Sequence, residues 1–231
     1  MISLLLFDVG DTILDTPGHQ EALQEAHRAA LARFGFELSA GEYQQLDHDK
    51  MRQFVPSPMH AITWHYARPD VRLFNEITRE VRSHYPEIWA LGFRLHPGIA
   101  AVLEQLAKEY SLALAGNAPA RITENLDELG VLRWFRHREV SGSLGIKKPD
   151  EGFFRTILDR AGCSPSEAIM IGDRLDNDII PAKRLGLRTV WFRQGRYAAL
   201  EPRVPDELPD ATVTDLESLP SAIRSIAGKA S

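Results

Sequence analysis

Short, continuous apolar runs recur along this chain and constrain its fold more than any other feature. Their hydrophobicity does not alternate, which indicates strands that are covered on both faces of a sheet. Amphipathic segments with helix-ending glycines lie between the later runs, at 99–110, 121–129 and 153–161. This alternation predicts an α/β fold with a doubly wound parallel sheet and helices on both sides. The expected strands are residues 4–7, 112–115, 168–171, 187–192 and 211–213.

The segment between the first and second runs is different, because almost all of it has a helical pattern. We expect helices at 20–34, 40–54 and 70–84, with Pro and Gly residues at both ends of the segment marking hinges. The chain has 231 residues, of which 44% are hydrophobic, enough for one large core and a smaller second one. The sequence therefore predicts a core domain of residues 1–15 and 95–231. A helical cap domain of residues 16–94 is expected over the carboxyl ends of the strands.

Charge and composition exclude several classes of partner. The net charge is −5, which gives no electrostatic reason to expect nucleic acid or an anionic membrane. No apolar run approaches the ~20 residues of a membrane helix, and residues 4–7 are too short for a signal peptide, so we expect a cytoplasmic protein. Cys163 is the only cysteine, so any metal must be held by oxygen or imidazole.

Four polar stretches follow the apolar strands or lie near them: DVGDT at 8–12, AGNAP at 115–119, GIKKPD at 145–150 and GDRLDND at 172–178. An open parallel sheet gathers such stretches at one edge, which would bring Asp8 close to Asp173. Two adjacent carboxylates are unfavourable unless a cation compensates them, and hard oxygen ligands suit Mg²⁺. Lys147 or Lys148 can supply positive charge to a phosphoryl group. The pattern predicts a magnesium-assisted phosphoryl-transfer site.

The order and spacing of these stretches resemble the haloacid dehalogenase (HAD) superfamily, in the subgroup whose helical cap follows the first motif. GDRLDNDIIPAKRLGL at 172–187 is the closest match, and KKPDEGFF at 147–154 is the next. The resemblance implies a Rossmann-like core and a hydrolase that acts on a small phosphorylated metabolite. Asp8 would attack phosphorus to form an aspartyl phosphate, which water then hydrolyses.

Individual site residues follow from the same resemblance. Mg²⁺ would be held by Asp8, the backbone carbonyl of Gly10 and Asp173. Lys148 would neutralise the nucleophile and the phosphate, and Asp178 would orient Lys148 or a metal-bound water. The remaining substrate contacts would come from the backbone around residues 116–117, so the predicted substrate-binding residues are Gly116, Asn117 and Lys148.

The first motif departs from the family pattern D-x-D-G-T, because Gly10 stands where the second acid is expected. That acid protonates the leaving oxygen and then activates water, work worth about 10² to 10⁴ in rate. The Gly10 carbonyl can still bind metal. Asp11 is one position late, and we expect it to be a turn residue that bonds nearby amides, although a remodelled turn could let it replace the acid.

The second motif departs too, since Gly116 replaces the usual Ser or Thr. A hydroxyl contact to phosphate is missing, while the backbone amides of 116 and 117 can still donate. Together the two departures predict weak activity on ordinary monoesters. A substrate with a good leaving group, such as an acyl phosphate, would need the missing acid least.

Three alternatives remain open on the sequence. In a phosphonate-cleaving hydrolase, the cap residue Lys50 would form a Schiff base with the substrate. A dehalogenase would attack carbon without a metal, and Asp173 argues against that branch. A decayed domain would only bind a phosphorylated ligand or a protein, which Gly10 and Gly116 together motivate.

Smaller features concern the cap and the fourth motif. His60, Trp64, His65 and Tyr66 are candidates to line a substrate pocket or to pack the cap, and we favour packing for Trp64. Asp176 and Asn177 are expected to cap the helix that follows them. The sequence makes no prediction of oligomeric state.

Overall fold

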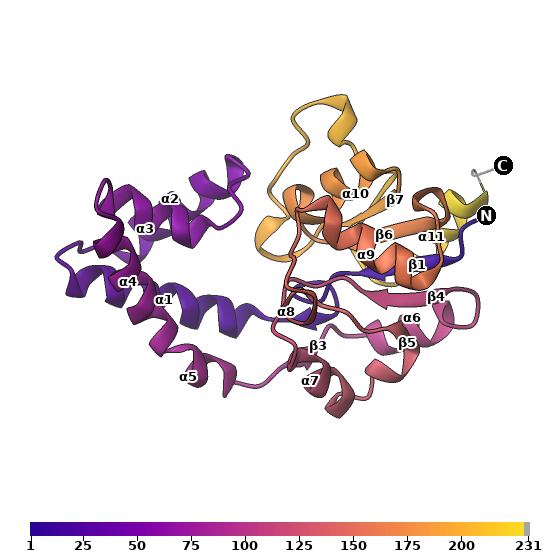
Figure 1. Ribbon diagram of the computed structural model, residues 1–231, viewed down its shortest axis with the longest axis horizontal. Helices are drawn as coiled ribbons and strands as arrows, with labels where there is room; N and C mark the ends of the chain where they lie inside the picture. The colour runs from indigo at the N-terminus through magenta and orange to yellow at the C-terminus, as the bar shows by residue number, and fades with distance from the viewer. Residues whose placement is uncertain (229–231) are drawn as a thin grey trace. The chain divides into compact units, whose positions relative to one another are not determined.

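A computed structural model describes residues 1–228 of the chain (Figure 1). Its residues divide into two compact units, which we describe separately. The core unit consists of Met1–Asp15 and the described residues from Phe93 onward, and the helical unit consists of Thr16–Gly92.

The core unit is built on a parallel six-stranded sheet with the order β5-β4-β1-β6-β7-β8. Helices flank this sheet, so the predicted α/β class with a doubly wound parallel sheet is confirmed. The strands are β1 (Leu4–Phe7), β4 (Ser111–Leu114), β5 (Phe135–His137), β6 (Ala168–Gly172), β7 (Arg188–Phe192) and β8 (Ala211–Val213). A separate antiparallel pair joins β2 (Leu14–Asp15) to β3 (Arg94–Leu95), where Arg94 and Asp15 form an ion pair of 2.7 Å.

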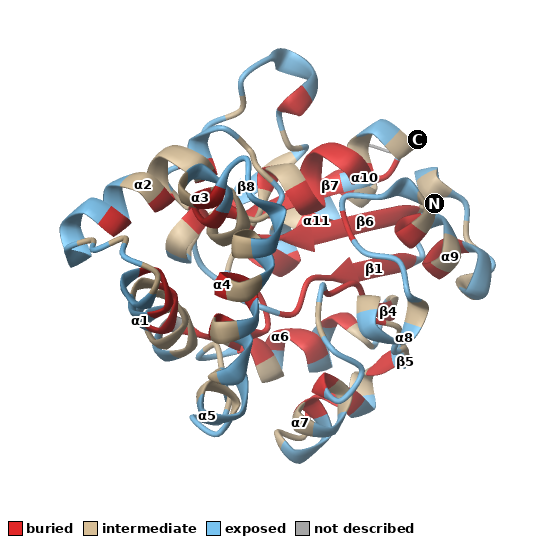
Figure 2. Cartoon of the chain, turned by 60° about the vertical axis from the view of Figure 1, so that its left-hand side comes forward, coloured by how far each residue is buried: buried red, intermediate tan, exposed pale blue. Residues whose placement is uncertain are grey.

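Strand β1 lies at the centre of the sheet and is completely buried (Figure 2). Leu4 pairs with Ser111 of β4 on one side and with Ala168 of β6 on the other. The chain therefore winds outward in both directions from β1. Such a switch point, at the carboxyl ends of the strands, is where open α/β sheets bind ligands.

The helices of the core unit bury apolar faces against the sheet. Helix α9 shows how they are specified: the Asp150 side chain accepts from the N–H of Gly152 at its start, and Gly162 ends it with φ of 63°. Phe153 and Phe154 of α9 are fully buried in the cluster that contains Leu4. The helices are α6 (Ile99–Leu106), α7 (Ile122–Glu128), α8 (Ser141–Leu144), α9 (Glu151–Ala161), α10 (Ile180–Leu185) and α11 (Leu219–Gly228).

The core unit differs from the prediction in several places. The strand pair β2–β3 and the helices α8 and α11 were not predicted, and two further differences concern α6 and β5. Helix α6 ends at Leu106, four residues before the predicted end, because residues 107–109 form a turn before β4 begins at Ser111. Strand β5 was not predicted, since only Phe135 of its three residues is buried and the short strand carries no apolar run.

The helical unit contains α1 (Pro17–Arg33), α2 (Ala40–Arg52), α3 (Pro58–Ala67), α4 (Val71–Ser83) and α5 (Tyr85–Trp89). Its three longest helices correspond to the three predicted ones, whereas α3 and α5 were missed. Both missed helices begin next to a proline, which is compatible with the first helical turn although prolines also mark loops. Ala30, Leu31, Tyr43, Ile62 and Val81 form the centre of a core that all four longer helices share.

A buried histidine of α1 forms hydrogen bonds with side chains of α2 and α3. His27 of α1 is 0% exposed; its Nδ1 lies 2.7 Å from the Tyr43 hydroxyl and its Nε2 lies 2.9 Å from Thr63 Oγ1. Because the Thr63 hydroxyl donates to the Met59 carbonyl, it accepts from Nε2–H, and Nδ1 accepts from Tyr43. Burial, assisted by the charge of His60, lowers the pKa of His27 to about 4. This histidine is therefore neutral at physiological pH.

A search of the described helices for a membrane span finds none with the required length and apolar character.

Candidate active site

The predicted nucleophile, Asp8, directly follows the central strand. Its N–H donates to the Ile171 carbonyl of β6 at 2.9 Å, and the Phe7 carbonyl before it accepts from Ala115 N–H at 2.7 Å. The backbone at Asp8 is thus held from both neighbouring strands. Its carboxylate comes to the carboxyl edge of the sheet and is nearly buried.

Lys148 reaches this carboxylate from a distant part of the sequence. Its Nζ lies 2.6 Å from Asp8 Oδ1 and 2.5 Å from Asp178 Oδ1, and the lysine is 2% exposed. Burial alone would lower the pKa of Lys148, but the charges of Asp178 and Asp8 outweigh it and raise the pKa above its usual value. The ammonium group is therefore charged, and it bridges two carboxylates. Lys147, the other candidate in the sequence, is exposed.

Asn117 holds the backbone of Lys148. Its Nδ2 donates to the Lys148 carbonyl and its Oδ1 accepts from the Lys148 N–H, both at 2.9 Å. The side chain predicted to bind substrate is thus occupied in positioning the lysine. Neither the N–H of Asn117 nor that of Gly116 donates to another group in residues 1–228, so these two amides stay available to an anion.

Asp178 is completely buried and uses both of its oxygens. Oδ1 accepts from Lys148, and Oδ2 accepts from the N–H of Arg174 at 3.0 Å. Gly172 makes this approach possible, since a Cβ there would stand 2.5 Å from Asp178 Cγ. Burial raises the pKa of Asp178 to about 6, although the charge of Lys148 opposes the shift. Its contacts fit the predicted role of orienting Lys148.

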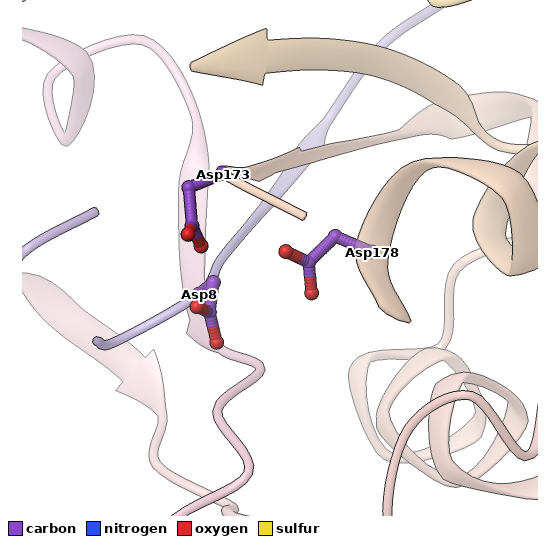
Figure 3. Close-up of side chains that lie close together, drawn as sticks. All are labelled: Asp8, Asp173 and Asp178. Carbon is purple, nitrogen blue, oxygen red and sulfur yellow. The ribbon is translucent and has the colours of Figure 1, made fainter. Parts of the chain in front are cut away.

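Asp173 completes a cluster of three buried aspartates. One carboxylate oxygen from each of Asp8, Asp173 and Asp178 lies within 4.8 Å of the others (Figure 3). Among residues 1–228, no group donates a hydrogen bond to the Asp173 carboxylate. Burial, followed by the charges of Asp8, Asp178 and Asp11, raises the pKa of Asp173 well above its usual range. Three carboxylates against one ammonium group leave an excess of negative charge, which fits a site for a cation with oxygen ligands.

The backbone turns sharply after Asp8. Gly10 has room for a side chain, because a Cβ built there meets no atom within 4 Å and its φ is not positive. Asp11 adopts a left-handed φ of 51° within a turn. Its Cβ and Cγ lie 3.8 and 3.9 Å from a Cβ built on Gly195, in the loop that follows β7, and its charge acts on Asp173. The three-aspartate cluster does not include Asp11.

Val9 accounts for the glycine of the second motif. The pairing of Phe7 with Leu114 places Val9 opposite Gly116, two positions further along both segments. A Cβ on Gly116 would stand 2.6 Å from Val9 Cγ2 and 2.9 Å from Val9 Cβ. A serine or threonine therefore cannot stand at 116 while Val9 keeps this position.

The expectation that Asp176 and Asn177 cap the following helix is wrong. Asp176 instead forms a two-pronged ion pair with Arg174, through bonds of 2.6 and 3.1 Å, and no side chain caps the turn from Leu175 to Ile179. With its amide turned over, Asn177 accepts from the same guanidinium group. An arginine next to Asp173 competes for these side chains, and the guanidinium also stacks on Tyr197, with Cζ 4.5 Å from the ring centroid.

Two supporting residues were missed in the sequence. Arg174 joins the fourth motif to Tyr197, and Trp191 donates from Nε1 to the Asp173 carbonyl at 2.8 Å. The adjacent Asp173-Arg174 pair and the Asp two residues later were visible signals for Arg174. No local pattern marks Trp191, because its contact depends on the pairing of β6 with β7.

The chain matches a known protein family over most of its length. The family of haloacid dehalogenase-like hydrolases matches residues 5–192, which include all four polar stretches. The chain belongs to this family. The predicted HAD membership and the predicted class of enzyme, a hydrolase, are therefore confirmed.

Relatives of this HAD hydrolase carry phosphatase names. It is 28% identical to a glyceraldehyde 3-phosphate phosphatase from Methanopyrus kandleri, over 98% of this chain and 99% of the relative. It is 29% identical to a phosphoserine phosphatase from Thermus thermophilus, over 94% and 98%. A haloacid dehalogenase-like family hydrolase from Streptococcus pneumoniae shares the fold, with a TM-score of 0.72, 17% identity and coverage of 96% and 98%.

The remaining candidate residues of the HAD hydrolase lie in the helical unit. Lys50 is half-buried near the end of α2. His60 and Trp64 of α3 each lie 5.9 Å, between ring centroids, from Phe74, and Tyr66 lies 5.2 Å from Phe36. Trp64 makes this packing contact but stays 40% exposed. These contacts explain the packing of the unit and assign no substrate contact to it.

Proposed function

We propose that this HAD hydrolase is a Mg²⁺-dependent phosphatase that releases phosphate from a small phosphorylated metabolite through an aspartyl phosphate on Asp8. The observation that carries the proposal is the arrangement of Lys148 between Asp8 and Asp178, beside a further buried carboxylate at Asp173. The phosphatase names of the curated relatives agree with it. The cap role of the helical unit and a cytoplasmic location are parts of the same proposal.

Each residue of the site has a separate role in this proposal. Asp8 is the nucleophile, and its Oδ2 is the oxygen that Lys148 does not hold. Asp8, the carbonyl of Gly10 and Asp173 would hold Mg²⁺, which when bound neutralises carboxylate and phosphate charge. Lys148 stabilises negative charge on the transferring phosphoryl group, and Asp178 keeps the ammonium group in place. The amides of residues 116 and 117 donate to phosphate oxygens.

The dehalogenase alternative is disfavoured by Asp173, because attack on carbon needs no metal and this buried carboxylate adds to a cluster that suits a cation. The phosphonate-cleaving alternative depends on Lys50 and predicts that borohydride traps this lysine in the presence of a phosphonoaldehyde. The binding-only alternative predicts no turnover of any phosphate ester.

Release of inorganic phosphate from p-nitrophenyl phosphate and acetyl phosphate, with and without Mg²⁺, tests the proposal. We expect release by the wild type to require Mg²⁺ and to fall by at least ~10³-fold in Asp8→Asn, which removes the nucleophile. Asp127→Asn, at an exposed site in α7, is the matched control. If Asp8→Asn and the wild type released phosphate equally, the proposal would be wrong.

A further inference from the structure

The groups that the structure places against Asp8 all have tasks other than donating a proton. Lys148 is held by two carboxylates, and Asp178 accepts from Lys148 and from Arg174 N–H. Asp173 lies in the carboxylate cluster, where a cation would occupy it. None of these residues is placed to protonate a departing oxygen on the substrate side.

Two further polar side chains, Asp11 and Tyr197, lie at the loop after β7. The Asp11 side chain lies against Gly195, and the Tyr197 ring lies under the Arg174 guanidinium group at 4.5 Å. At position 10 the chain offers open space, with no atom within 4 Å of a built Cβ, and no side chain to fill it. Position 10 itself therefore has no acidic side chain to offer a leaving group.

From this arrangement we infer that the substrate is a phosphoryl compound whose leaving group departs as a stable anion, with acyl phosphates as the class. This inference rests on the proposed function. Proton donation to a leaving oxygen is worth about 10² to 10⁴ in rate when the leaving group is a poor one. A carboxylate, with a pKa of about 4, needs no such donation, whereas a phenol of pKa about 10 gains from it and an alkoxide gains more.

The chemical step balances without an acid. A bond forms between an Asp8 oxygen and phosphorus while the bond from phosphorus to the acyl oxygen breaks, and the electron pair stays on that oxygen as a carboxylate. Water then attacks phosphorus and the bond to Asp8 breaks. The oxygen of water enters inorganic phosphate, its two protons pass to phosphate or solvent, and the Asp8 carboxylate is regenerated.

The dependence of rate on the leaving group tests this inference. The substrates are acetyl phosphate, phenyl phosphate and glycerol 3-phosphate, and kcat/KM is measured for each after subtraction of the Asp8→Asn background. We expect the wild type to prefer acetyl phosphate to phenyl phosphate. Gly10→Asp, which fills the open space with an acid, should reduce the ratio of the two kcat/KM values by ~10²-fold or more.

Two control variants separate acid chemistry from other effects. Gly10→Asn adds a side chain of the same size without a proton to give, and Asp11→Asn removes the neighbouring acid; both should keep the ratio of the wild type. The inference is overturned if Gly10→Asp leaves the ratio unchanged, or if Asp11→Asn selectively slows phenyl phosphate. Wild-type rates within ~10-fold of one another on all three substrates would also overturn it and leave the phosphatase function intact. If no substrate shows release that depends on Asp8, the proposed function itself fails.

Discussion

The Cγ2 methyl group of Val9 stands 2.6 Å from the position that a Cβ atom would take at Gly116. The valine and the glycine therefore form a matched pair, one on each side of the contact between the segments that follow β1 and β4. The size of the side chain at position 9 therefore limits the size of the side chain at position 116, and the reverse also holds.

Gly116→Ser should destabilise the protein by about 1–3 kcal/mol, because the new side chain overlaps Val9. Val9→Ala removes Cγ2 but keeps Cβ, which stands 2.9 Å from the built position, so the double variant should recover part of that loss. The double variant should also show a lower KM for phosphate esters, because it carries a hydroxyl group in the second motif. Urea unfolding of the four proteins gives the coupling energy between the two sites. Strictly additive effects would show that the two side chains do not meet.

Asn117→Ala should lower kcat by about 10²-fold, because the Lys148 backbone loses both hydrogen bonds that fix it. Asn117→Asp keeps the acceptor for the Lys148 N–H but sets a carboxylate oxygen against the Lys148 carbonyl, so it should not restore kcat. Steady-state kinetics checks this, with Asn125→Ala in α7 as the control. An unchanged kcat in Asn117→Ala would contradict the positioning role.

Removal of charge at Asp173 should separate metal binding from folding. Without metal, Asp173→Asn should raise the melting temperature, since burial and the charges of Asp8 and Asp178 make the ionised carboxylate unfavourable. Mg²⁺ at 100 times its Kd should stabilise the wild type by about 2.7 kcal/mol and leave Asp173→Asn unchanged. Thermal unfolding with and without Mg²⁺, with Asp127→Asn as the control, measures both effects. If Mg²⁺ stabilised Asp173→Asn as much as Asp127→Asn, the cation would bind elsewhere.

A low pH should lower the stability of the helical unit, because His27 becomes protonated when the chain unfolds. The pKa of His27 is about 4 in the folded protein, whereas the pKa of an ordinary solvent-exposed histidine is 6.5, so the unfolded chain binds the proton more readily. Stability should therefore decline as the pH falls from 6.5 toward 4, by a total of about 3 kcal/mol from this residue. Urea unfolding of wild type and His27→Gln at pH about 4.5 and about 7.5 isolates the effect. His48→Gln in α2 is the control, and an identical pH dependence in His27→Gln would refute the prediction.

The sequence predicted the long-range architecture well where it carries continuous apolar runs. Such runs located β1, β4, β6, β7 and β8 to within one or two residues, because strands that are buried on both faces are apolar at successive positions; β8, with only Val213 buried, has the weakest run. The three-residue strand β5 and the short helix α5 were missed for the opposite reason. A segment of a few residues is too short to show a hydrophobic period, and its conformation depends on the neighbours that the tertiary fold supplies.

For the site, the order of the polar stretches anticipated that Asp8 lies close to Asp173, and the resemblance to the HAD superfamily added Lys148 and Asp178. The structure brings these four side chains together. The sequence could not anticipate which partner each side chain satisfies. The Asn117 side chain forms hydrogen bonds with the Lys148 backbone, and Asp176 pairs with Arg174 instead of capping a helix. Both outcomes are choices among several nearby donors and acceptors, which only the three-dimensional arrangement resolves.

The central position of β1 also limits the order in which the sheet can form during synthesis. Leu4 pairs with Ser111 and Ala168, which follow it in the chain by 107 and 164 residues. A nascent chain that has left the ribosome only as far as β5 has an exposed edge on β1 and half of an active site. Asp173 and Asp178 arrive with the very segment that covers this edge, so the acquisition of activity reports that synthesis has passed β6 and that the sheet has closed around its first strand.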